Sequence, residues 1–536
     1  MPEYLSPGVY VEEISVGPKP IEGVSTSTAG FVGATERGPE PPRFITGWLD
    51  YQRWYGGYVP DSSFLAYAIR GFFDNGGQRC FVSRIVADDA VATSGAIGNL
   101  NLAAIGRGVW GNNVMIKVDD ATQNDAAAGR DWFRVSILYY TSNPPDPTSP
   151  DFVDPTSSDP ADLTDPNRRI PDVIEVYDNL SEETGNNNVV TIINTSSRLI
   201  RVAWQGAGPD RLPNQAVTVL GTNGSDSTAS ANIVAADYIG DNDAIPGSPD
   251  PAEELLGRSR GLTALEFIDE ISLLLAPDEV RRTPEDLSPV TTEVINQCER
   301  LKDRFGVISV IRGQNDVAAV PARRDTSYAA FYYPWIEIFD PSTNDTRLVP
   351  PTGHVTGIFA RTDVERGVHK APANETIRGA RNLEFPVTKQ MQDMLNPQGV
   401  NCVRDFRSDG RGIRLWGART MSSDGEWKYV NVRRLFLFVE ESIEEGTQWV
   451  VFEPNHEPTW ARVSRSVTNF LIRVWRDGAL AGITQDEAFF VKCDRTTMTQ
   501  DDIDNGRLIC YIGIAPVKPA EFVIFRISQK TVEATS

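Results

Sequence analysis

Two stretches of the chain alternate short apolar runs with amphipathic helical patterns. In residues 26–90, AGFVG at 29–33 is typical of a buried strand, and residues 64–85 indicate a helix, a stop at Asn75-Gly76-Gly77 and a second strand. Residues 236–380 repeat this alternation. Helical patterns occupy 252–277 and 291–306, and apolar strand patterns lie at 307–313 and 335–341. The alternation predicts an α/β core, built from 26–90 and 236–380, with a mainly parallel sheet.

The stretch between these two parts, residues 91–235, has the two-residue period of β-strands. The strand patterns are NNVMIKV, WFRVSILYY, VVTII and QAVTVL, and a loop rich in Pro, Asp and Ser at 143–171 interrupts them. Residues 91–250 hold 21 acidic against 9 basic residues, a net charge of −12. We therefore expect an inserted all-β domain with an acidic Pro-rich loop that faces water.

Residues 381–515 mix both kinds of pattern and predict an α+β C-terminal domain. RRLFLFVEE (433–441) and QWVVFEP (448–454) suggest strands, whereas PTWARVSRSVTNFLIRVWRDG (458–478) indicates one long helix. At 100° per residue, four arginines of this helix fall within an arc of about 80°. These are Arg462, Arg465, Arg473 and Arg476. Their stripe suits either solvent or an acidic partner surface.

The two ends of the chain each carry a strand pattern with no partner beside it in sequence. Residues 1–25 and 516–536 are interrupted by prolines, which keep a segment extended and out of its own fold. The pattern predicts two extended terminal arms with strand character and does not by itself identify what they pair with. The arm residues are Val9, Tyr10, Val11 and Ile14 at the start and Phe522, Val523, Ile524, Phe525 and Ile527 at the end.

Size, cysteine usage and charge narrow the functional classes. A chain of 536 residues exceeds one core and predicts several domains. No run of about 20 apolar residues predicts a membrane span, and the first residues lack the pattern of a secretory signal. The five cysteines contain no CxxC pair, so neither a zinc site nor a disulfide framework is indicated. The net charge of −22 argues against general nucleic-acid binding.

No sequence motif argues for catalysis or for a cofactor. The chain has no phosphate-binding GxxxxGK[ST], no dinucleotide GxGxxG after a strand and no GxSxG nucleophile turn. GDNDAIPG (240–247) lacks the register of a calcium loop. His354 and Asp363 with a nearby serine could be imagined as a triad, although ordinary polar residues explain them better. We expect neither enzymatic activity nor a bound metal or cofactor.

In several sequence segments, the chain outside 91–235 resembles the tail sheath proteins of contractile phage tails and contractile injection systems. The strings include SPGVYVEEI, AGFVGATERGP, FFDNGGQRCFVSRI and PPTGHVTGIFARTDVERGVHKAPAN. The longest match runs from LNPQGVNCVRDF through YVNVRRLFLFVEESI and FLIRVWRDGALAG to IAPVKPAEFVIFRI. The inserted region is where sheath proteins differ most.

The resemblance implies a structural subunit without enzymatic activity. Subunits would form stacked six-membered rings around an inner tube, and each terminal arm would join two copies by adding a strand to an open sheet edge of a neighbour. Contraction from a metastable extended state would drive the tube through a target envelope. The implied partners are further copies of the chain, the tube protein, the baseplate and a terminal cap, but no nucleic acid and no inserted membrane. Synthesis would take place in the bacterial cytoplasm, followed by incorporation into a phage tail or tail-like particle.

The resemblance also gives roles to the predicted parts. The α/β regions 26–90 and 236–380 would be the sheath core, 91–235 an outer domain, and 381–515 the tube-facing, lattice-forming C-terminal domain. The four arginines of the long helix would contact the tube. Two alternatives stay open at this point. One is an α/β enzyme with accessory domains, and the other is a tail-tube or capsid protein that does not contract.

Overall fold

The computed structural model divides the chain into two compact units. The larger unit contains residues 25–366 and 371–430, and the C-terminal unit contains residues 1–24, 367–370 and 431–536. The structure describes residues 20–59, 63–123, 131–142, 144–205, 212–226, 233–240, 260–278, 284–317, 320, 324–524 and 526. The N-terminal arm residues Val9, Tyr10, Val11 and Ile14 lie outside this range, as do Phe525 and Ile527 of the C-terminal arm.

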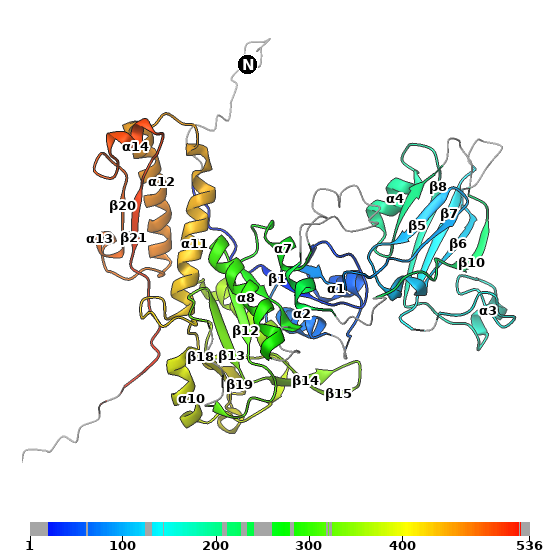
Figure 1. Cartoon of the computed structure of the whole chain (residues 1–536), viewed down its shortest axis with the longest axis horizontal. Helices are drawn as coiled ribbons and strands as arrows, with labels where there is room; N and C mark the ends of the chain where they lie inside the picture. The colour runs from blue at the N-terminus through cyan, green and yellow to red at the C-terminus, as the bar shows by residue number, and fades with distance from the viewer. Residues whose placement is uncertain are drawn as a thin grey trace, which may run out of the picture. The chain divides into compact units, whose positions relative to one another are not determined.

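The larger unit is built on a nine-stranded sheet with the order β16-β19-β18-β13-β12-β11-β1-β3-β2 (Figure 1). The six strands from β18 to β3 are parallel, and the strands at both margins are antiparallel. The strands are β1 (Ala29–Gly33), β2 (Arg43–Ile45), β3 (Cys80–Arg84), β11 (Leu273–Leu275), β12 (Phe305–Ser309), β13 (Ala329–Tyr333), β16 (Glu375–Thr376), β18 (Val400–Asp405) and β19 (Ile413–Leu415). The predicted α/β fold with a mainly parallel sheet is confirmed.

Buried strands explain why this region shows continuous apolar runs. Every residue of β1, β11, β12 and β13 is buried, as expected where helices cover both faces of a parallel sheet. The helices are α1 (Trp48–Tyr55), α2 (Leu65–Asp74), α5 (Ala235–Ile239), α7 (Gly261–Leu265), α8 (Pro284–Leu301), α9 (Thr352–Arg366) and α10 (Lys389–Leu395). A separate sheet joins β14 (Ile336–Asp340), β15 (Asp345–Val349) and β17 (Ala380–Leu383).

The predicted helix over 252–277 is wrong at its end. Residues 273–275 form β11 between β1 and β12, and the described part of the helical pattern is the short α7. The run ISLLLAP is apolar without a helical period. A fully buried central strand and a buried helix segment look alike at that length.

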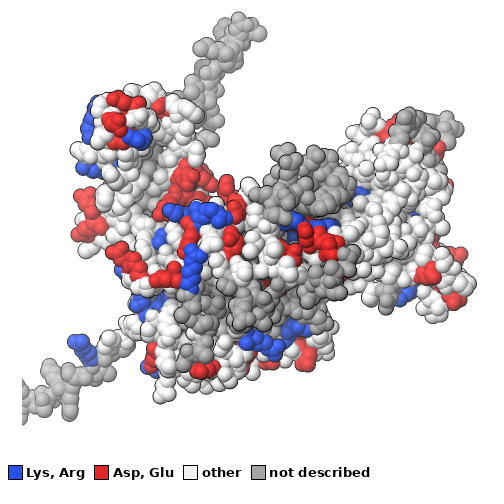
Figure 2. All heavy atoms as spheres, in the orientation of Figure 1, with Lys and Arg blue, Asp and Glu red and all other residues white. Residues whose placement is uncertain are grey.

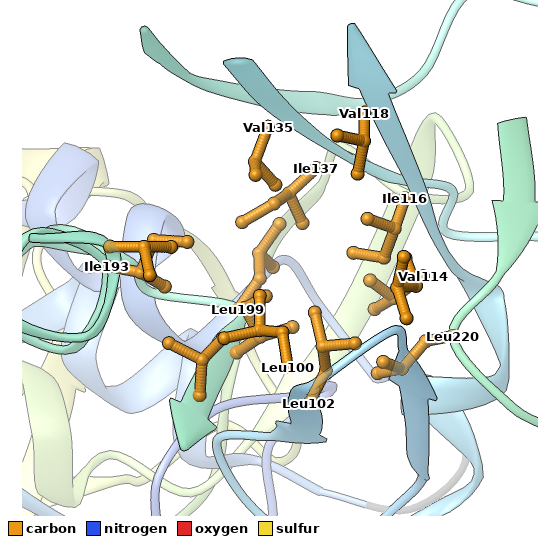
Figure 3. Packing of buried hydrophobic residues seen from close by; sticks show 14 of the residues in the cluster. Leu100, Leu102, Val114, Ile116, Val118, Val135, Ile137, Ile193, Leu199 and Leu220 are labelled. Atoms are coloured by element: carbon orange, nitrogen blue, oxygen red, sulfur yellow. The ribbon is translucent and has the colours of Figure 1, made fainter. Parts of the chain in front are cut away.

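The insertion forms two antiparallel sheets. One has the order β10-β6-β7-β8 and the other β4-β5-β9. A cluster of buried aliphatic residues from both sheets fills the space between them, with Leu100 and Leu102 facing Ile116 and Ile137 (Figure 3). The strands are β4 (Ser94–Ile97), β5 (Leu100–Ala104), β6 (Val114–Asp120), β7 (Phe133–Tyr139), β8 (Val173–Leu180), β9 (Ile200–Trp204) and β10 (Gln215–Val219).

Two short helices modify the expected all-β insertion. α3 (Pro160–Thr164) lies within the acidic Pro-rich loop, and α4 (Val189–Ser196) replaces the strand predicted from VVTII. The side chain of Asn188 accepts a hydrogen bond from the Thr191 amide at 2.9 Å and so caps the start of α4. This cap, together with the buried Val189 and Ile193, outweighs the β-propensity of the run.

The C-terminal unit packs two long helices with a small hairpin. α11 (Val430–Thr447) and α12 (Glu457–Arg476) are followed by α13 (Gln485–Ala488), β20 (Phe489–Lys492), α14 (Gln500–Asp504) and β21 (Tyr511–Ile514). The strands predicted from RRLFLFVEE and QWVVFEP are wrong. The first lies in α11, and the second begins with a 3-10 turn, Gln448–Val450. The apolar part of the first run, Leu435 to Val439, is buried or partly buried within α11. Five consecutive apolar residues are too few to separate a strand from a helix by their period.

The border between the units differs from the boundary expected at residue 381. Strand β18 pairs in parallel with β13, and β19 pairs with β18, so residues 400–415 complete the sheet of the larger unit. The chain therefore enters the C-terminal unit for its long final stretch at Asn431. Among the described residues, no helix is both long and apolar enough to cross a membrane.

Candidate functional site

Helix α12 presents two chemically opposite faces, as its sequence predicts. Val463, Val467, Phe470, Leu471 and Val474 are buried in one apolar cluster that also contains residues of α11 and β20. The four arginines of the stripe are all exposed. A groove of about 500 Å³ runs along this face, lined by Arg462, Arg465, Ser466, Asn469, Ile472, Arg473, Arg476 and by Pro20 and Ile21 of the N-terminal segment.

The four arginines differ in their neighbours. The guanidinium of Arg462 lies 4.4 Å from the ring centroid of Trp449 and 3.5 Å from the carboxylate of Glu453. Arg473 donates a hydrogen bond to the carbonyl of Ile21. Arg465 and Arg476 make no polar contact with the described residues. Half of the stripe, Arg462 and Arg473, is thus engaged inside the unit.

The described root of the N-terminal arm is fixed to the C-terminal unit. Ile21 is only 1% exposed and packs in the cluster between α11 and α12. The amide of Val24 donates to the hydroxyl of Ser442 at 3.1 Å. A Cβ added to Gly446 would lie 2.7–2.9 Å from Ile21, and one on Gly23 would lie 2.8 Å from Phe438. Two small residues of α11, Ser442 and Gly446, therefore make room for the arm root.

Sequence reasoning missed this anchoring site. Ser442 and Gly446 are four residues apart and lie on one face of a helix, which is a signal for a close neighbour. The signal was hidden because 433–441 was interpreted as a strand. The stripe arginine that holds the root, Arg473, was interpreted only as a contact for a partner.

The hairpin of β20 and β21 offers open strand edges. Its four residue pairs run antiparallel from Phe489↔Ile514 to Lys492↔Tyr511. Within the described residues these two strands form a sheet of their own, so each has one unpaired edge. Phe490 and Tyr511 are more than half exposed. A two-stranded sheet is of marginal stability by itself, and an open edge is a template for another strand.

The C-terminal arm begins attached to its own unit and then becomes exposed. Pro516 forms an isolated antiparallel bridge with Leu480, and the amide of Val517 donates to the carbonyl of Ala479 at 3.2 Å. Phe522 and Val523 are each 70% exposed, and Ile524 is 77% exposed. Successive side chains of an extended segment point to opposite sides, so both sides of this segment are uncovered by described residues. Three adjacent large apolar side chains in water are unfavourable, at about 25 cal/mol per Å² of apolar surface. This segment is therefore suited to burial against a partner.

The imagined catalytic group is not assembled. His354 and Asp363 are nine residues apart on α9, which places them on opposite sides of the helix. His354 is buried, and burial lowers its pKa to about 4, which keeps the ring neutral. Asp363 accepts a hydrogen bond from the hydroxyl of Thr26 at 2.7 Å. Nowhere in the described ranges do three or more His, Cys, Asp or Glu side chains gather as a metal site would require.

Basic and acidic side chains are mixed on the drawn face of the molecule (Figure 2). Blue Lys and Arg side chains are interspersed with red Asp and Glu side chains over the described part of this face (Figure 2). A surface that binds nucleic acid through phosphates carries Lys and Arg in a continuous patch. The described part of this face shows no such patch.

Two protein-family models together match more than half of the chain. The model of the phage tail sheath protein central domain matches residues 259–421, and that of the phage tail sheath C-terminal domain matches residues 422–530. A prophage major tail sheath protein of Pseudomonas aeruginosa is 28% identical over 286 residues, which span 51% of this chain and 69% of that protein. The tail sheath protein of Burkholderia phage BcepMu is 29% identical over 185 residues, 32% of this chain and 38% of the relative.

Solved structures share the fold over nearly the whole chain. The helical sheath of the anti-feeding prophage in its contracted state has a TM-score of 0.54 at 23% identity and covers 98% of this chain and 100% of that chain. The sheath complex of the extracellular contractile injection system PVC, also contracted, has a TM-score of 0.55 at 22% identity, with 99% of each chain covered. The chain therefore belongs to the phage tail sheath protein family and is a structural subunit of contractile, phage tail-like systems.

Proposed function

We propose that the chain polymerises into stacked six-membered rings around an inner tube and contracts from a metastable extended state, driving the tube through a target envelope. One observation carries the proposal: the C-terminal unit holds both an uncovered apolar arm and a hairpin with open edges. An exposed apolar segment and an open strand edge on the same chain allow the segment of one copy to complete the sheet of another.

The energy of such a link is adequate for a lattice. Four to six ladder hydrogen bonds at about 0.5–1.5 kcal/mol each, with the burial of Phe522, Val523 and Ile524, make each link worth several kcal/mol. The N-terminal arm, rooted at Ile21, supplies a second link by the same chemistry. Links of this strength, repeated around each ring, hold neighbours together while the rigid parts rotate and shift.

The proposed partners follow from the surfaces of the C-terminal unit. Arg465 and Arg476 face an acidic inner tube, with Arg462 and Arg473 beside them. The relatives include a sheath in the contracted state and a baseplate structure of the anti-feeding prophage, which supports self-assembly that begins from a baseplate and ends at a cap. Synthesis in the bacterial cytoplasm and incorporation into a phage tail or tail-like particle complete the proposal. The larger unit is the sheath core, and its insertion lies on the outside.

The test removes one backbone hydrogen-bond donor of the C-terminal arm. Val523→Pro removes one backbone donor and leaves the folded units untouched, whereas Val523→Thr keeps the donor and serves as the matched control. Negative-stain electron microscopy of the chain co-expressed with its tube protein is expected to show ringed sheaths for wild type and Val523→Thr, and unassembled subunits for Val523→Pro. A variant without residues 1–19 keeps the buried Ile21 and tests the other arm in the same way. Normal sheaths from both arm variants would refute the proposed links.

A further inference from the structure

Two cysteines lie opposite each other just beyond the paired part of the hairpin. The register of β20 and β21 ends at Lys492↔Tyr511, and one further step places Cys493 opposite Cys510. The amide of Ala515 donates to the carbonyl of Ala488 at 2.8 Å, which marks that pair as hydrogen-bonded. Because the two kinds of pair alternate in an antiparallel ladder, Cys493 and Cys510 occupy a non-hydrogen-bonded position.

That position has the geometry that a disulfide needs. Non-hydrogen-bonded pairs hold their Cα atoms about 4.5 Å apart with the side chains close together. The Cα separation of disulfides starts at about 4.4 Å. Cys493 and Cys510 also pack in one apolar cluster with Trp460 and Met498, so both side chains point to the same side of the hairpin.

A groove leads to the pair, and the two thiols influence each other. A groove of about 530 Å³, lined by Trp460, Arg465, Cys493, Asp494 and Arg495 among others, leads to Cys493. Cys493 is 8% exposed at the bottom of this groove, and Cys510 is partly exposed. A hydrogen bond from the Cys510 thiol lowers the pKa of Cys493, and the same interaction raises the pKa of Cys510. Cys493 is therefore the better nucleophile of the two.

The remaining three cysteines are less reactive because they are fully buried. Cys80, Cys298 and Cys402 are fully buried in the larger unit. Burial raises the pKa of each of these thiols, which suppresses the thiolate that reacts. Among the five cysteines, only Cys493 and Cys510 lie opposite each other beside a groove, and Cys510 is partly exposed.

We propose that Cys493 and Cys510 are a site of reversible oxidation and form a cross-strand disulfide within one chain when it meets a low-molecular-weight organic disulfide. The thiolate of Cys493 attacks one sulfur of the small disulfide, giving a mixed disulfide and one thiolate leaving group, which takes up a proton. Cys510 loses its proton to solvent, attacks the Cys493 sulfur and expels the second small thiol. Both protein thiols are oxidised, and the small disulfide is reduced to two thiols.

The consequence is a covalent closure of the loop between the strands. The bond ties residue 493 to residue 510 and restrains the segment that contains α14. This chemistry depends only on the hairpin and not on the proposed arms or tube. The hairpin is also the edge that we propose as an acceptor of arms, so oxidation would fix its shape after the chain leaves a reducing compartment.

The experiment uses the full-length chain, treated with oxidised glutathione or with dithiothreitol and then alkylated. Trypsin cleavage after Lys492, Arg495 and Arg507 separates the two cysteines. After oxidation we expect a linked pair, residues 493–495 joined to the peptide beginning at Leu508, with the loss of two hydrogen masses. The chain should run as a monomer on a non-reducing gel, and dithiothreitol should release the pair.

Three variants make the result specific. Cys493→Ser and Cys510→Ser should each abolish the linked peptide, and Cys298→Ser should retain it. Circular dichroism of each variant establishes that it is folded. Free alkylation of both thiols after oxidation of a folded chain, lasting glutathione adducts on either cysteine, or a dimer joined by these cysteines would each overturn the proposal.

Discussion

At the scale of residues, the most constrained positions are those where one side chain fills a space left by a glycine. A Cβ on Gly71 of α2 would lie 2.3 Å from the ring of His354, and one on Gly446 would lie 2.7 Å from Ile21. Both sites are enclosed, so neither ring nor aliphatic chain has room to retreat. Any larger side chain in place of Gly71 or Gly446 should therefore destabilise the packing around His354 or Ile21.

Acidification should destabilise the larger unit through His354. Its pKa is about 4 when folded, against about 6.5 in the unfolded chain, because burial disfavours the charged ring. Between these values the unfolded state binds the extra proton, so this contribution to stability is complete above pH 6.5 and is lost as pH falls toward 4. The loss is about 2 kcal/mol by pH 5. Urea unfolding at pH 7 and pH 5 measures it, and His354→Asn, which cannot titrate, should show a smaller difference. An equal difference in both chains would contradict the assignment.

The Gly446→Ala change should release the arm root. Alanine improves the intrinsic stability of a helix by about 1 kcal/mol relative to glycine, yet its Cβ would overlap Ile21. We expect faster cleavage after Glu22 by a glutamate-specific protease, with α11 intact by circular dichroism. Gly425→Ala is the matched control, because a Cβ there meets nothing within 4 Å. Equal cleavage of the two variants would show that Gly446 does not hold the root.

At the scale of elements, α12 is the part that sequence described best. A strict helical period separates its buried face from its arginines, so the geometry follows from spacing alone. What spacing could not give is the neighbours of each arginine. Arg473 contacts Ile21, more than 450 positions earlier in the chain, and such a contact is fixed only by the tertiary fold.

Other elements show where sequence reasoning fails and why. The runs at 273–275 and 435–439 are short and consist only of apolar residues, so neither contains the polar positions whose spacing would separate a strand from a helix. VVTII has strand propensity, but the Asn188 cap and tertiary burial make it helical. Strands β1, β3, β6 and β7 were predictable because turn-forming residues flank each of these apolar runs.

Charge reversal on α12 should separate binding to the tube from folding. Arg465→Glu with Arg476→Glu changes the two arginines that make no polar contact with described residues, so the unit should keep its unfolding midpoint. We expect loss of sheath from co-expressed tubes, seen by electron microscopy. The control, Arg312→Glu with Lys389→Glu, makes the same change of charge on exposed residues of the larger unit. Sheathed tubes from the α12 variant, or equal loss in the control, would refute a specific contact.

At the scale of the whole molecule, the insertion is joined to the core by a compact set of contacts. The guanidinium of Arg107 binds the carboxylate of Glu40 at 2.6 and 2.9 Å, and both side chains are buried. The hydroxyl of Tyr139 donates to Glu36 at 2.7 Å. Val91 and Ser225 exchange backbone hydrogen bonds, so the two ends of the insertion lie side by side.

This arrangement makes the insertion removable. Joining Val91 to Ser225 through a short Gly-Ser linker should leave a folded chain that still assembles into contractile sheaths. Glu40→Gln accompanies the deletion, because a buried carboxylate without Arg107 would cost about 3–5 kcal/mol. Electron microscopy before and after a contraction trigger measures the outcome. A deleted chain that is folded but never assembles would show that the insertion belongs to the lattice.

The arm root has a consequence for how sheath proteins can vary. Residues 1–24 and 431–536 belong to one unit, so both arms leave the chain from its smaller part. In the proposed lattice, mechanical force would pass between neighbouring subunits through these small units alone. Each larger unit would be attached to its small unit at the four points where the chain passes from one unit to the other. The larger unit is then free to change in size and surface. Foreign domains could be inserted into it without changing the contacts that join the small units.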